Sequence, residues 1–146
     1  MASRRKGRIL AFQALYSWEA SKPVLTELTS FSWLDEDKRL ALDEGTSTFA
    51  RLMVLGAIEN IKDIDALIVQ HLKNWDFSRL NRVDLAVLRM SVYALKYQTE
   101  VASTIVIDEA VDISKEYGSD DSYRFVNGVL DGIRKTLELE PKPSVG

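Results

Sequence analysis

The chain has 146 residues, 46% of them hydrophobic and 28% charged, which is usual for one globular domain. Its 19 cations and 22 anions give a net charge of −3, which excludes a protein that is basic over its whole surface, so any contact with nucleic acid has to be local. The absence of cysteine excludes disulfides and thiolate chemistry, and the absence of a long apolar run excludes a membrane span, so we expect a cytoplasmic protein.

Apolar residues recur at helical spacing along almost the whole chain. In the first expected helix, Ile9, Phe12 and Tyr16 lie three and four residues apart. The second expected helix begins at Pro23, which suits a first helical turn, and ends near the polar stretch 32–38. In chain order, the expected helical segments cover about residues 4–20, 23–31, the mid-40s to 73, 78–80, 85–95, 103–117 and 119–133.

Local residues predict where these segments bend or end. The long third helix is expected to bend or break near 60–63, and Gly118 to end a later helix in the left-handed conformation. The β-branched run 101–107 has no partner strand elsewhere, so we interpret it as a loop that enters a helix. The candidate N-cap residues are Ser78, Ser103 or Thr104, and Ser119 or Asp120.

These segments predict an all-α fold, a compact helical bundle of about seven helices whose short connections favour antiparallel neighbours. Residues 1–140 are expected to form a single domain. The tail 141–146, PKPSVG, is expected to be disordered.

Residues that could carry chemistry are few. His71 is the only histidine, and with no cysteine it cannot build a usual zinc site, so we expect a plain edge role at a helix end. Asp108 and Glu109 diverge by about 100° on a helix, which suits a solvated first turn better than an acid–base pair. No nucleotide-binding loop or nucleophile elbow is present. We therefore expect no enzyme, no cofactor and no metal.

The basic segment at the start of the first helix is unusual. Arg4, Arg5, Lys6 and Arg8 precede any acidic residue. Cations oppose the helix dipole at this end, so the segment indicates either a solvated helix end or a site for an anion. Arg4 and Arg8 share a face, and Gly7 is expected to add local flexibility.

The stretch 119–129, SDDSYRFVNGV, contains a second candidate surface. Phe125 lies at the edge of the apolar stripe, where either a core or a ligand-binding role fits, and Asn127 points away from the stripe. Gly128 and Gly132 lie one turn apart inside an expected helix, which indicates close approach by another helix or a ligand.

Three blocks of sequence carry a resemblance to a known family. They are RRKGRILAFQALYSWEA (4–20), NWDFSRLNRVDLAVLRMSVYAL (74–95) and VIDEAVDISKEYGSDDSYRFVNGVLDGI (106–133). With these blocks the chain resembles the NusB family of bacterial transcription antitermination factors over nearly its full length. Ala94 and Ala102 depart from the family pattern, which usually has Glu and often Pro at these positions.

The resemblance implies an all-helical fold of two three-helix subdomains and no catalytic activity. It also implies binding of single-stranded boxA RNA together with a small-subunit ribosomal protein, NusE, in an elongation complex with RNA polymerase and other Nus factors, which supports transcription of ribosomal RNA operons. The RNA-binding residues carried over are Arg4, Arg5, Lys6, Arg8, Tyr16, Asp121, Ser122, Phe125 and Asn127. Tyr16 and Asp84 are the partner-binding residues; we expect Asp84 and Phe125 to be largely exposed.

Two alternatives remain at this point. The first is an RNA-binding or adaptor domain related to the N-terminal domain of ribosomal RNA cytosine methyltransferases, which would be followed by a cofactor-binding α/β domain; because the chain stops at Gly146, we favour the free-standing factor. The second is a helical adaptor that binds only protein.

Overall fold

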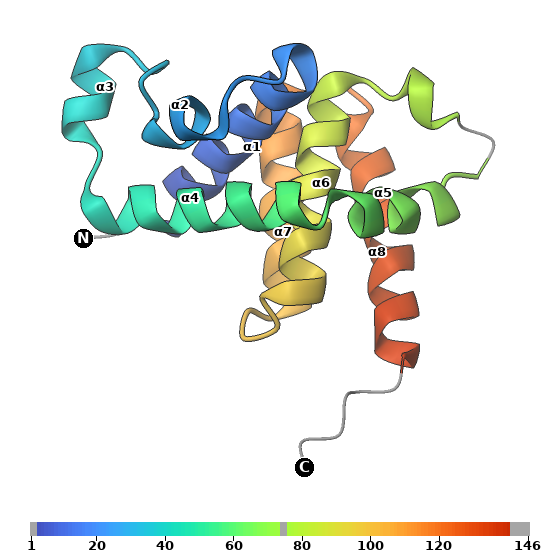
Figure 1. Cartoon of the computed structure of the whole chain (residues 1–146). Helices are drawn as coiled ribbons and strands as arrows, with labels where there is room; N and C mark the ends of the chain where they lie inside the picture. Colours follow the sequence, from blue (N-terminus) through green and yellow to red (C-terminus); the bar gives the residue numbers. More distant parts are fainter. Residues whose placement is uncertain (1–2, 74–75, 141–146) are drawn as a thin grey trace.

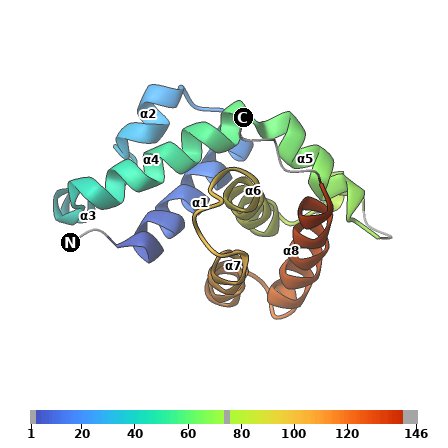
Figure 2. The ribbon, with the colours of Figure 1, turned by 90° about the horizontal axis from the view of Figure 1, so that it is seen from below.

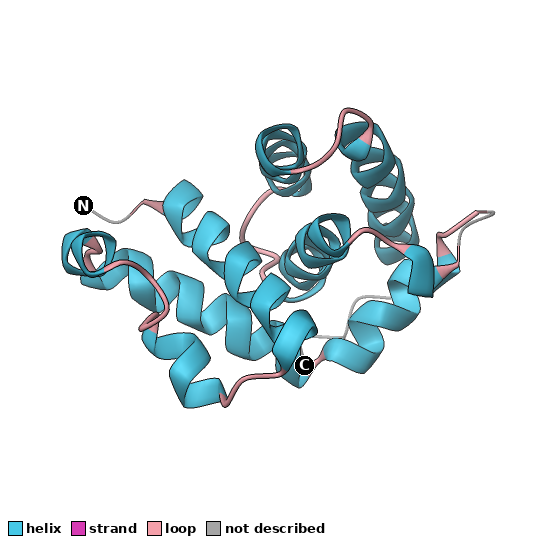
Figure 3. Cartoon of the chain, turned by 90° about the horizontal axis from the view of Figure 1, so that it is seen from above, coloured by secondary structure: helices cyan, strands magenta, loops and turns pink. Residues whose placement is uncertain are grey.

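The computed structural model describes residues 3–73 and 76–140. The expected tail 141–146 and residues 74–75, which open the second motif block, lie outside the described residues. Within the described ranges all regular structure is helical (Figures 1 and 3), which confirms the all-α prediction. The elements are α1 (Arg4–Ser21), α2 (Leu25–Ser30), α3 (Glu36–Ala41), α4 (Glu44–Glu59), α5 (Ile61–Gln70), the 3₁₀ turn η1 (Phe77–Arg79), α6 (Arg82–Tyr97), α7 (Ser103–Tyr117) and α8 (Ser122–Leu139).

Helix α6 lies at the centre of the molecule and packs against α1, α4, α5, α7 and α8 (Figure 2). Its stripe of Leu85, Leu88 and Val92 is buried, and so are Val87 and Met90 beside that stripe. A helix that is apolar over so wide an arc has to be covered by neighbours on several sides. Helices α1, α2 and α4 form one three-helix group and α6, α7 and α8 another, joined mainly through α1 and α6.

A buried arginine ties α6 to two of these neighbours. Arg89, which is 4% exposed, donates hydrogen bonds to both carboxylate oxygens of Asp65 at 2.9 Å and to Glu19 Oε2 at 2.7 Å. Burial opposes ionisation of Glu19, but the hydrogen bonds from Arg89 and Lys22 hold its pKa below the ordinary value. The guanidinium thereby links α1, α5 and α6 through charge-assisted bonds.

The helix boundaries confirm part of the prediction. The long third helix is broken at Asn60, inside the expected interval, and residues 101–102 form a loop that enters α7. Helix α3 was not expected, because it lies in a polar stretch without an apolar stripe, and none of its residues is buried. No described helix is both long and apolar enough to cross a membrane.

The expected caps were wrong. Asp76, not Ser78, caps η1, since its side chain accepts the Ser78 N–H. Helices α7 and α8 begin after Ala102 and Asp121, and neither residue caps through its side chain. Gly118 has φ −93° and ψ −172°, which is extended rather than left-handed. The hydroxyl of Ser122, the first residue of α8, accepts the N–H of Ser119 in the preceding turn at 3.0 Å.

Candidate nucleic-acid interface

Two contacts fix the start of α1. The hydroxyl of Ser3 accepts the Lys6 N–H at 3.2 Å, and the Ser3 N–H donates to Thr46 Oγ1 on α4 at 2.8 Å. Helix α1 therefore begins at Arg4 and carries its cations in the first turns, with no acidic residue there. Because the N-terminal end of a helix is itself positive, this end attracts anions.

Arg4 and Arg8 share a face, as predicted, and that face lies on Phe49 of α4. Their Cζ atoms lie 5.7 and 5.6 Å from the ring centroid. A Cβ at Gly7 would lie 2.5 Å from Phe49 Cδ1, so glycine permits close packing here instead of adding flexibility. Arg8 is only 6% exposed, and burial lowers its pKa from the ordinary value. Arg8 is therefore a packed side chain in the isolated chain, and its contact with RNA stays a prediction.

Arg5 is paired within the chain. Its Nη2 lies 3.2 Å from Glu109 Oε1 and 2.8 Å from Asp112 Oδ2, both on α7. Hydrogen bonds to Glu109 and then Asp112 raise the pKa of Arg5. The expected solvated first turn at Asp108 and Glu109 was also wrong, because α7 begins five residues before Asp108 and Glu109 faces Arg5.

Arg4 and Lys6 are the two exposed cations of this segment that remain outside salt bridges in the described part of the chain. Of the segment's three exposed cations, these two can accept an external anion without first giving up a carboxylate partner among the described residues, whereas Arg5 cannot.

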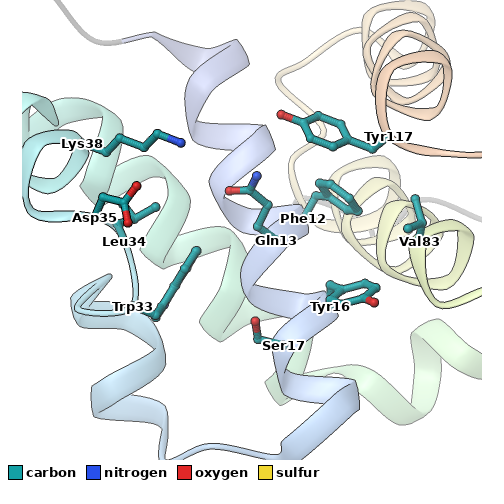
Figure 4. A pocket seen from close by; sticks show the side chains of 10 residues that line it. All are labelled: Phe12, Gln13, Tyr16, Ser17, Trp33, Leu34, Asp35, Lys38, Val83 and Tyr117. Atoms are coloured by element: carbon teal, nitrogen blue, oxygen red, sulfur yellow. The ribbon is translucent and has the colours of Figure 1, made fainter.

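A groove leads from this end of α1 towards Tyr16. It comprises one hollow of about 440 Å³, lined by Tyr16, Trp33 and Val83 among others, and one of about 300 Å³ that begins at Lys6. Both hollows are lined by Gln13, Leu34, Lys38 and Tyr117. In Figure 4, Trp33 and Lys38 lie on one side of the first hollow, Tyr16 and Tyr117 on the other, and Gln13 between them.

The aromatic walls of this groove are held in place. Tyr117 packs on Phe12 with ring centroids 5.2 Å apart, and the Trp33 Nε1–H donates to the Leu28 carbonyl at 2.9 Å. Tyr16, Trp33 and Tyr117 are each between 37 and 38% exposed. Fixed, half-exposed rings are suited to stacking on bases or on partner side chains.

Asp84, at the start of α6, is 8% exposed, so the expectation of an exposed carboxylate was wrong. Its Oδ1 is buried and has no hydrogen-bond partner among the described residues. Burial raises the pKa of Asp84, and the neighbouring Ser122 side chain opposes that rise. The carboxylate faces a hollow of about 230 Å³ that Phe125 and Asp121 also line. Asp84 thus places a buried acceptor oxygen, Oδ1, at the wall of a hollow.

The other residues expected near the start of α8 differ in exposure. Asp121 and Asn127 are exposed. Ser122 is only 2% exposed and its hydroxyl is bonded to Ser119, so it supports the helix start and is not an open contact. Phe125 is partly buried and packs against the core, so the expectation of a largely exposed ring was wrong.

The start of α6 brings two of these regions together. Val83 lines the hollow beside Tyr16, and Asp84 lines the hollow beside Phe125. Arg4 lies 12 residues before Tyr16, about 18 Å along α1.

Sequence reasoning missed Trp33, Lys38 and Tyr117, which line the groove. An aromatic residue followed by charge in a polar stretch was the available signal for Trp33 and Lys38.

His71 has the expected edge role. Its ring nitrogens lie 2.9 Å from the Leu67 carbonyl and 2.8 Å from Thr136 Oγ1. Across residues 3–73 and 76–140 no cluster of three or more His, Asp or Glu could hold a metal ion.

The chain is similar to known proteins over most of its length. The NusB family model matches residues 5–135. The transcription antitermination protein NusB of Treponema denticola is 53% identical over 131 residues, which cover 90% of this chain and 95% of that protein. The solved structure of T. maritima NusB has a TM-score of 0.81 at 36% identity, covering 92% of this chain and 93% of that chain. A chain in the crystal structure of the antitermination factors NusB and NusE in complex with dsRNA has a TM-score of 0.81 at 31% identity, covering 91% and 96% of the two chains. This chain belongs to the NusB family.

Proposed function

We propose that this protein is a transcription antitermination factor that binds boxA-type single-stranded RNA together with the small-subunit ribosomal protein NusE. In this role it supports processive transcription of ribosomal RNA operons, in the cytoplasm and within an elongation complex. It acts by binding, without catalysing a reaction or using a cofactor, and residues 1–140 serve as one RNA-binding domain.

The observation that carries this proposal is the arrangement of free cations and aromatic rings along one groove. Lys6 lines one end of the groove, with Arg4 in the same first turns of α1, and Tyr16 lines the other end as a half-exposed ring. Single-stranded RNA needs both, because phosphates require neutralisation and unpaired bases stack on aromatic faces. Beyond the start of α6, Asp121, Asn127 and the edge of Phe125 extend the same RNA surface.

Tyr16 and Asp84 are proposed to bind the ribosomal partner. Asp84 has an unpaired, buried carboxylate oxygen, which a donor group of a basic protein would satisfy. The cost of leaving this acceptor unpaired in the free protein is recovered when the partner binds. Arg8 and Ser122 support the surface from beneath, and Arg5 contributes once it leaves its carboxylates.

Filter binding tests this function directly. A boxA RNA oligonucleotide is titrated with this protein, with the ribosomal partner and with the mixture, at several salt concentrations, and a scrambled RNA serves as the control. We expect the mixture to bind boxA more tightly than either protein alone. Arg4 and Lys6 are each expected to neutralise one phosphate. Replacing both by Gln should then make the slope of log affinity against log salt shallower by roughly 1.4. Equal binding of boxA and scrambled RNA would reject the function; partner binding without RNA binding would leave a protein-only adaptor.

A further inference from the structure

Phe125 also lines a further hollow, which lies between the end of α5 and α8 and is separate from the one beside Asp84. This further hollow has a volume of about 460 Å³. Its lining in the described residues includes the cations Lys73 and Arg124 and no carboxylate, although the chain as a whole is acidic. The lining residues are Gln70, His71, Lys73, Arg124, Phe125, Gly128, Val129 and Gly132. The hollow is therefore a local positive site on a negative protein.

The two glycines that line it differ in what surrounds them. A Cβ at Gly132 would lie 2.9 Å from His71 Cδ2, so the chain itself requires glycine there. A Cβ at Gly128 would meet nothing within 4 Å. Glycine inside a helix is less stable than alanine, and Gly128 lies well inside α8. Packing within the chain explains Gly132 and leaves Gly128 unexplained.

The wall behind Gly132 is rigid. Both ring nitrogens of His71 are in hydrogen bonds, one to α5 and one to Thr136 of α8. The hollow is thus held open by fixed groups. Arg124, by contrast, is exposed, and its ion pair with Asp121 is long, at 3.9 Å. Its Nε–H also donates to the Tyr123 hydroxyl at 2.9 Å, and the guanidinium remains exposed for a ligand.

We propose that the sugar–phosphate backbone of the bound RNA crosses α8 at Gly128, with a phosphate facing Lys73 and Arg124. This inference rests on the proposed function and extends the RNA path beyond the start of α6. Phe125 lines both this hollow and the one beside Asp84, so the two hollows are neighbours on either side of its ring. Asn127, which precedes Gly128, is exposed.

The charges favour RNA over a protein as the occupant. A phosphate matches two cations in a lining that holds no carboxylate, where the nearest acidic group is the distant Asp121 partner of Arg124, and a backbone that lies directly on a helix requires a residue without a Cβ. A basic partner would be repelled by Lys73 and Arg124.

The test compares glycine-to-alanine substitutions at Gly128 and Gly132, which lie one turn apart on α8. Gly128→Ala should raise the melting temperature by a few degrees, because alanine favours the helix, and should weaken boxA binding by the protein–partner mixture about tenfold. Gly132→Ala should lower the melting temperature, because its Cβ meets His71. If Gly128→Ala leaves RNA affinity unchanged, or lowers stability, the inference is wrong. If it weakens partner binding without RNA, the occupant is protein.

A charge substitution provides an independent readout. Lys73→Gln should make the salt slope of boxA binding shallower by about 0.7, with the melting temperature unchanged. Lys62→Gln, an exposed lysine at the other end of α5, is the matched control and should change neither quantity. An unchanged slope for Lys73→Gln, while the Arg4 and Lys6 variant still flattens it, rejects this crossing and keeps the proposed function. Wild-type protein that fails to select boxA rejects both.

Discussion

Arg89 lies in the centre of the molecule with three of its N–H groups bonded to Asp65 and Glu19, whereas Arg4 and Lys6 lie at the end of α1 without a carboxylate partner among the described residues. A buried cation is tolerated only when its hydrogen bonds are satisfied inside the protein. A cation left open at a helix start reduces helix stability slightly and remains available. The comparison separates positive charge that holds the fold from positive charge that stays exposed and outside salt bridges in the described residues.

The largest expected effect on stability comes from removing the buried arginine. Arg89→Ala leaves Asp65 and Glu19 without their shared partner and should lower the free energy of unfolding by about 3–5 kcal/mol. Arg134→Ala removes a partly exposed arginine that also has two carboxylate partners, and should change the free energy of unfolding far less, because solvent screens these ion pairs. Urea unfolding followed by circular dichroism measures both. Similar losses of unfolding free energy in the two variants would show that burial does not make the Arg89 ion pairs more stabilising than those of Arg134.

A smaller effect divides the basic segment itself. Arg8→Ala removes a buried side chain from Phe49 and should cost about 1–2 kcal/mol of stability, while the salt slope of RNA binding stays level. Arg4→Ala should leave stability nearly unchanged and make the slope shallower by about 0.7. Thermal unfolding measures the stability of both variants, and RNA titration at several salt concentrations measures their salt slopes. A shallower slope for Arg8→Ala would place its guanidinium on the RNA after all.

The smallest expected effect is the pH dependence of stability that the buried carboxylate of Asp84 causes. The pKa of Asp84 is raised by burial, so the folded state disfavours its charged form. Stability is therefore lost as pH rises through the folded pKa and regained as pH falls towards about 3.9. Asp84→Asn should melt higher than wild type at pH 7, and the difference should shrink towards pH 4. Melting curves between pH 4 and 7 check this; a constant difference would contradict the burial argument.

The sequence predicted the features that depend on local periodicity. The apolar stripes located seven of the eight α-helices in the described residues, with α4 and α5 expected as one long helix that bends or breaks near 60–63. The i, i+4 spacing of Arg4 and Arg8 placed them on one face. Helix α3 has no apolar stripe and was missed.

Features that depend on contacts between distant residues were not predictable in this way. Arg5 meets Glu109 across 104 positions, and Arg8 is buried because Phe49 of another helix covers it. Spacing places a residue on a face of its helix, but only the packed neighbours decide whether that face is open. The same limit explains why Asp84 and Ser122 were expected to be accessible and are buried.

The carboxylates that hold Arg5 have a consequence for how RNA is chosen. Glu109 and Asp112 act as a built-in competitor for the guanidinium, so a phosphate gains Arg5 only by displacing them. We infer that a weakly bound polyanion would not displace these carboxylates and would meet only Arg4 and Lys6. An RNA held along the groove would displace them and gain Arg5 as a third cation. The contribution of Arg5 would then lie in discrimination between RNAs more than in affinity for any one of them.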